Sequence, residues 1–124
     1  MNRKLLSECR RQLIRDFPAW NGGWWMVVIC TGSKSHEAQV LSHVFAVNDA
    51  QVEYSAPPGT VQQTRETAAI GVPGRSRESI RFGCPACPAE PTVSRVRWGE
   101  ITSAARRAGL PWLDVSDLNR RGVS

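Results

Sequence analysis

The chain has 124 residues, of which 41% are hydrophobic and 22% are charged, and its formal net charge is +5. This length fits one domain and excludes two full-sized ones, and the composition excludes a wholly disordered chain. A chain of this size buries only about two-thirds of its unfolded surface, so we expect a modest hydrophobic core.

The first half of the chain predicts one helix followed by three strands. Apolar residues spaced three or four apart predict an amphipathic helix over residues 4–17, inside an N-terminal helical segment of residues 1–20. Pro18 ends this pattern. The β-forming residues that follow predict strands over residues 24–30, 40–47 and 51–55, the last two joined by a turn at Asn48 and Asp49.

The second half is less regular. Residues 56–78 contain several prolines and glycines among polar residues and predict a long loop. Residues 79–82 predict a short strand, and residues 93–98 a half-exposed strand that carries Arg95 and Arg97 on one side. We expect a helix and a terminal segment over residues 99–118, in which Gly109 caps the helix.

The strongest local motif is Cys84-Pro85-Ala86-Cys87, because two thiolates at this spacing on a tight turn can face one metal ion. A tetrahedral site needs two more ligands, and Cys30 and His36 supply them as a Cys₃His set. His43 is the alternative histidine ligand. Cys9 lies on the apolar face of the first helix and is predicted to be a buried hydrophobic residue.

Two catalytic interpretations of these cysteines are disfavoured. A thioredoxin-like redox pair begins a helix, whereas Pro88 and Pro91 follow Cys87. A zinc nucleobase deaminase needs H-x-E and P-C-x-x-C, whereas Glu37 directly follows His36 and a glycine precedes Cys84. Four protein ligands also leave zinc no open position for water, so we expect a structural zinc ion and no enzymatic activity.

These elements predict an α+β fold in which a small antiparallel sheet surrounds a zinc ribbon. The zinc-ribbon core is expected over residues 24–98, including the long loop at 56–78. The N-terminal helix precedes this core and the C-terminal helix follows it, within a single domain of residues 1–124.

The chain also resembles small zinc-ribbon proteins of unknown function that actinobacteria and actinobacteriophages encode. The resemblance covers roughly residues 24–118. It rests on Cys30 and His36-Glu37, on residues 81–87, on the helix ending near Gly109 and on the segment at residues 113–118. It implies a zinc site at the same four ligands, and it implies no activity.

Two kinds of partner follow as expectations. The first is a host protein, such as the transcription machinery if a phage encodes this chain, bound by a protein-interaction module that presents Trp20 and Trp24. The alternative is a sequence-tolerant DNA or other nucleic-acid partner, bound by an arginine-rich face. The residues proposed for that face are Arg75, Arg77, Arg95, Arg97, Arg106 and Arg107.

We expect a cytoplasmic protein that does not enter a membrane. The basic first residues are followed by Leu-Leu-Ser-Glu-Cys-Arg-Arg, which is not the apolar stretch of a signal peptide. The longest apolar run, residues 24–30, is far shorter than the ~20 residues that a membrane-spanning helix needs.

Overall fold

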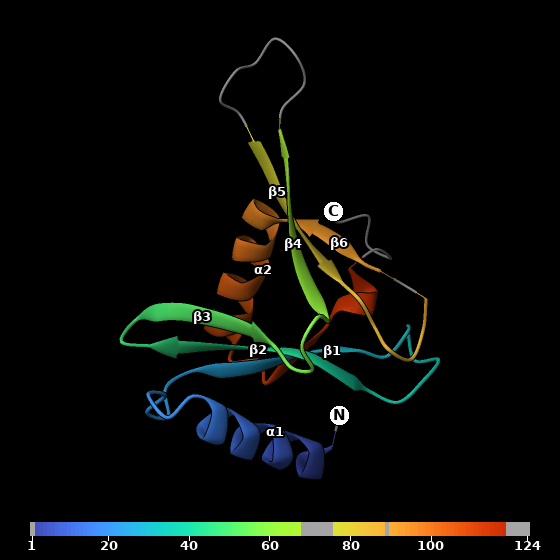
Figure 1. Cartoon of the computed structure of the whole chain (residues 1–124). Coiled ribbons are helices and arrows are strands. Elements are labelled where there is room, and N and C mark those ends of the chain that lie inside the picture. The colour runs from blue at the N-terminus through green and yellow to red at the C-terminus, as the bar shows by residue number, and fades with distance from the viewer. Residues whose placement is uncertain (1, 68–75, 89, 119–124) are drawn as a thin grey trace.

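The computed structural model describes residues 2–67, 76–88 and 90–118 of the chain. These residues form two α-helices, two β-sheets and a short 3₁₀ helix, η1 (Val115–Asp117), arranged as in Figure 1. The predicted α+β class is therefore confirmed. The sheets are more elaborate than the single small antiparallel sheet that we expected.

The larger sheet, sheet A, has the strand order β3-β2-β1-β7. Strands β1, β2 and β3 pair antiparallel, and β7 pairs parallel to β1, so sheet A is mixed. Asn48 and Asp49 both have positive φ, 49° and 69°, as the tight turn predicted between the second and third strands requires. The bounds are β1 (Trp25–Cys30), β2 (Gln39–Val47), β3 (Ala50–Ser55) and β7 (Trp112–Asp114).

The smaller sheet, sheet B, corrects the prediction of a loop over residues 56–78. Its antiparallel order is β4-β5-β6, formed by β4 (Val61–Thr67), β5 (Ser76–Phe82) and β6 (Thr92–Ser94). The polar sequence of β4 gave no apolar pattern, yet β4 is an edge strand that pairs with β5 through its backbone. Residues 68–75 of the predicted loop lie outside the described residues.

The two helices lie on different sides of sheet A. Helix α1 (Arg3–Asp16) covers the outer face of sheet A, and α2 (Arg95–Ala108) lies on the opposite side, next to sheet B (Figure 1). The strand predicted over residues 93–98 is wrong beyond Ser94, because α2 begins at Arg95. Gly109 ends α2 in the left-handed conformation, as predicted.

Burial on both faces explains the uninterrupted apolar sequence of β1. Val27 and Ile29 point toward α1, whereas Met26, Val28 and Cys30 point into the core between the two sheets. This inter-sheet core also takes side chains from sheet B and α2, including Ile80, Phe82, Val93 and Trp98. Cys30, the last residue of β1, therefore lies where the two sheets meet.

Candidate metal centre

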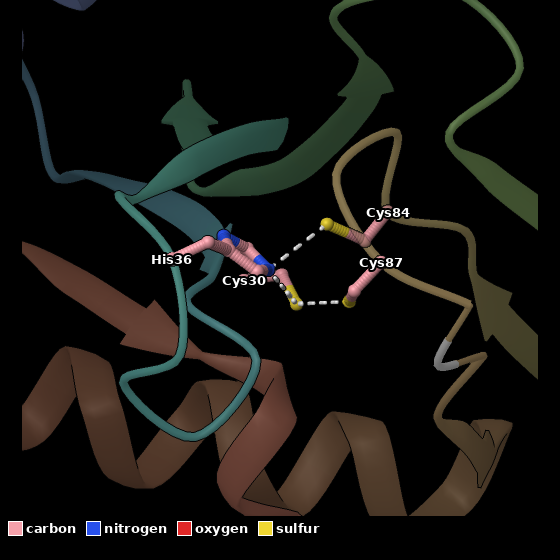
Figure 2. Close-up of side chains that lie close together, drawn as sticks. All are labelled: Cys30, His36, Cys84 and Cys87. Carbon is pink, nitrogen blue, oxygen red and sulfur yellow. Dashed lines mark hydrogen bonds between the residues drawn. The ribbon is translucent and has the colours of Figure 1, made fainter.

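The four predicted ligands come together from the two sheets. Cys30 ends β1 and His36 lies in the loop that follows it, whereas Cys84 and Cys87 lie in the turn between β5 and β6 (Figure 2). One ligand atom from each residue lies within 4.8 Å of the other three. Cys30 is fully buried and the other three are half-buried, so the cluster lies at the margin of the inter-sheet core.

The spacing of these atoms suits a tetrahedral metal ion. Cys30 Sγ lies 3.9 Å from Cys87 Sγ and 4.0 Å from His36 Nε2, and Cys84 Sγ lies 3.6 Å from the same nitrogen. Around a tetrahedral zinc ion the corresponding separations are about 3.8 Å for two sulfurs and about 3.6 Å for sulfur and nitrogen. The cysteines are free thiols, and the cluster is compatible with a metal site.

Each half of the cluster has a backbone N–H directed at its first cysteine. Gly32 N donates to Cys30 Sγ and Ala86 N donates to Cys84 Sγ, both at 3.4 Å and both from the second residue after the cysteine. Such donors stabilise negative charge on sulfur, the form in which cysteine binds a metal. The two turns are thus built alike, although one belongs to each sheet.

Gly32 is required by the geometry of the first turn. Its φ is +59°, and a Cβ placed there would lie only 2.8 Å from His36 Cδ2 and 2.9 Å from His36 Nε2. Any other residue would therefore strain the backbone here and clash with the His36 ring unless the ring moved.

The orientation of His36 is set by its other ring nitrogen. Nδ1 donates a 2.7 Å hydrogen bond to the carbonyl of Glu37, and this bond raises the pKa of His36. With its proton on Nδ1, the ring directs the lone pair of Nε2 toward Cys30 and Cys84. Metal-binding histidines are commonly held in this way.

Burial dominates the acidity of Cys30. It raises the pKa of the Cys30 thiol to about 12, against the opposing effect of the Gly32 N–H, and the neighbouring Cys84 adds to the rise. A thiol that is neutral at pH 7 loses its proton when it binds a cation. Metal binding here is therefore coupled to proton release.

A second layer of polar residues, which sequence reasoning missed, supports the loop after β1. The Asp114 carboxylate accepts hydrogen bonds from the backbone N–H and hydroxyl of Thr31 and from those of Ser116, and Ser33 N donates to Ser116 Oγ at 2.9 Å. Burial alone would raise the pKa of Asp114, but these hydrogen bonds outweigh it and lower the pKa. The sequence did contain a signal for this arrangement: Asp114 and Ser116 form an Asp-x-Ser motif, which is common in turns.

His43, the alternative histidine ligand, and Cys9, the fourth cysteine, both lie away from the cluster. His43 is fully buried on the α1 side of sheet A, where its Nδ1 accepts a 3.2 Å hydrogen bond from Trp25 Nε1. Cys9 packs with Val27 and Ile29 beneath α1, and burial raises its pKa to about 11. Cys9 is thus a buried core residue, as predicted.

The four residues of the predicted arginine face whose side chains the structure describes all lie on α2. Arg95 and Arg97 lie on α2 and not on a strand, and each is paired, with Glu53 and Glu100 respectively. Arg106 and Arg107 lie in the last turn of α2, where the helix dipole stabilises positively charged side chains. Arg75 and the side chain of Arg77 lie outside the described residues.

Neither Trp20 nor Trp24, the residues predicted to face a protein partner, is fully exposed. Trp20 is 7% exposed and packs with Leu13 and Phe45, with the Arg10 guanidinium 5.5 Å from the centre of its ring. Trp24 is half-buried beneath Arg106. Both indoles therefore belong to the packing of the fold.

Comparisons with known proteins give no match to this chain. Within the described ranges, neither helix is long and apolar enough to cross a membrane. The resemblance to zinc-ribbon proteins stays a prediction from the residues. No family model, no curated protein and no solved structure matches the chain.

Proposed function

We propose that this chain is a zinc-stabilised interaction module in which the metal ion holds two sheets together and performs no chemistry. The observation that carries the proposal is the position of the four ligands, two from each sheet at the point where the sheets meet. A metal ion at this point connects segments that are 57 residues apart, as Cys30 and Cys87 are.

Zinc is the metal that this ligand set favours. Three cysteines and one histidine form a common structural zinc site, and thiolates select zinc or copper(I) over magnesium, calcium or manganese. Both the separations between the ligand atoms and the N–H donors on Cys30 and Cys84 support this assignment.

A structural role agrees with the number of ligands. Catalytic zinc keeps a position for water, whereas the three sulfurs and His36 Nε2 would fill all four positions of a tetrahedral zinc ion. Structural zinc contributes on the order of 10 kcal/mol to folding. This is similar to the net stability of a whole domain, about 5–15 kcal/mol, so the fold is expected to depend on the metal.

The test is the metal content and thermal stability of purified protein. We expect one zinc per chain, loss of that zinc in Cys84→Ser, and loss of the native melting transition on chelation. Cys9→Ala is the matched control, because it removes a buried thiol outside the cluster and should retain zinc. His36→Gln should lose zinc and His43→Gln should keep it.

Two results would overturn the proposal. One is full zinc content in Cys84→Ser or His36→Gln. The other is an unchanged melting transition after the metal has been removed.

A further inference from the structure

Helix α1, which lies against the outer face of sheet A (Figure 1), is rich in positively charged residues. Five cations and two carboxylates lie within its 14 residues, and its buried residues, Cys9 and Leu13, face the sheet. All five cations are exposed. We call them the α1 basic face: Arg3, Lys4, Arg10, Arg11 and Arg15.

The stability of the helix does not explain this arrangement. The first turn of α1 contains Arg3 and Lys4 and no acidic residue. The amino end of a helix already carries partial positive charge, so cations there are unfavourable. In α2, by contrast, Arg106 and Arg107 lie at the favourable carboxyl end.

Most of the α1 basic face also has no ion-pair partner in the part of the chain that the structure describes. Among the described residues, Arg3, Lys4 and Arg11 form no ion pair, and Arg15 contacts only its neighbour Asp16, at 3.7 Å. The sequence-predicted cations Arg95 and Arg97 are both paired. The cations without an ion-pair partner are therefore concentrated on α1. We infer that they bind a negatively charged polymer outside this chain.

The burial and composition of α1 disfavour a lipid surface, a protein and a single-stranded nucleic acid as the partner. The apolar face of α1 is buried against sheet A, so the helix cannot insert that face into a lipid surface. A protein interface normally has aromatic anchors, and single-stranded nucleic acid needs aromatic rings for stacking. The outer side of α1 has neither, since Trp20 is buried beneath Arg10.

Duplex DNA matches the α1 basic face in charge and in dimensions. It carries one negative charge per about 1.7 Å of axis, and arginine binds phosphate through two parallel hydrogen bonds. From Lys4 to Arg15, α1 extends about 16 Å along its axis. The major groove of DNA is about 12 Å wide and admits a helix, whereas that of duplex RNA is too narrow.

We propose that the α1 basic face binds the phosphate backbone of double-stranded DNA without reading its sequence. The proposal names a partner for the interaction module and so rests on the proposed function. It also moves the predicted nucleic-acid surface from α2 and sheet B to α1. The metal cluster lies on the other side of sheet A, so the two proposals can fail separately.

The test is fluorescence anisotropy of a labelled 20-base-pair DNA with the zinc-loaded full chain, from 50 to 200 mM NaCl. We expect the logarithm of the affinity to fall linearly with log[NaCl], with a slope of about −0.9 for each phosphate contacted. The variant R3Q/K4Q/R11Q removes three unpaired cations. It should bind at least tenfold more weakly at 50 mM NaCl, with a slope smaller by about 2.7.

The matched control is R81Q/R97Q/R107Q, which removes the same charge from β5 and α2. It should bind within threefold of the wild type. Because the changes at Arg3 and Lys4 remove unfavourable charge from the first turn of α1, the melting temperature of R3Q/K4Q/R11Q should not fall.

Zinc content is measured in every sample, so that failure of DNA binding is separated from failure of the metal site. With zinc at one per chain, three results would overturn the DNA proposal: no binding by the wild type at 50 mM NaCl, equal losses in the two triple variants, or tighter binding to an RNA duplex of the same sequence.

Discussion

His43 is a titratable side chain with no solvent exposure, and it lies between the rings of Trp25 and Tyr54. Its Nδ1 accepts a hydrogen bond from Trp25, so the neutral ring carries its proton on Nε2, which has no partner among the described residues. A buried donor without an acceptor costs about 1–3 kcal/mol. Burial lowers the pKa of His43 to about 4, although the nearby Asp16 opposes the change.

This pKa predicts a pH dependence of stability. Between pH 6.5 and pH 4 the unfolded chain gains a proton at His43 that the folded chain does not accept, so stability falls as the pH falls. Between pH 7 and pH 5 the stability advantage of the wild type over His43→Gln should shrink by about 2 kcal/mol. Urea denaturation of both proteins measures it.

Both proteins keep the same four candidate metal ligands. Any pH dependence that arises from those ligands therefore cancels when the free energies of unfolding of the two proteins are subtracted. An equal difference at the two pH values would show that His43 titrates alike in the folded and unfolded chains.

The candidate site was largely predictable from the sequence, because cysteine and histidine spacing is a local property. The choice between His36 and His43 was not, because it depends on strand register. Val27 pairs with His43 across β1 and β2, and Val27 points toward α1 whereas Cys30 points into the inter-sheet core. Paired residues share a face, so the register takes His43 away from the cluster.

At the scale of elements, the start of α2 shows why an alternating pattern misled the prediction. Val93, Val96 and Trp98 alternate with arginine as in a half-exposed strand, yet Val96 is 77% exposed and Trp98 is buried. The Trp98 indole donates to Glu53 on β3, a contact that no local pattern encodes. The overlooked local signal is Ser94, whose hydroxyl accepts a 3.1 Å hydrogen bond from Arg97 N and caps the helix.

Removing this cap should destabilise the protein. Ser94→Ala leaves the Arg97 N–H without its acceptor and is expected to lower the free energy of unfolding by about 1 kcal/mol. Ser103→Ala is the control, because Ser103 is exposed in the middle of α2, where alanine is the better helix former. Chemical denaturation compares the two. A loss in Ser103→Ala equal to that in Ser94→Ala would contradict the capping role.

At the scale of the whole molecule, the two sheets share one core, and the metal cluster lies at its margin. Strand propensities predicted most of sheet A, whereas β4 was missed because edge strands need little apolar sequence. The parallel β1–β7 pairing was missed for a different reason: it joins segments more than 80 residues apart, and local patterns carry no information about such pairs.

Together with the proposed zinc site, the shared core predicts that loss of the metal would affect both sheets together. On chelation, the backbone amides of β1 and of β5 should lose protection from hydrogen exchange at the same chelator concentration, because the side chains of both strands pack in one cluster. Hydrogen exchange followed by mass spectrometry measures this, and re-addition of zinc should restore protection in both. Protection that persists in β1 after it is lost from β5 would show that the sheets unfold independently.

The hydrogen bonds between Asp114 and Thr31 have a consequence for the newly made protein. They join residues that are 83 positions apart, so the loop after β1 lacks this support until Asp114 has been synthesised. At 5–20 residues per second, a ribosome needs roughly 4 to 17 s to cover that distance. During this interval the loop that carries His36 and follows Cys30 lacks its hydrogen bonds to Asp114. The candidate metal cluster can therefore reach its final arrangement only after β7 has been translated.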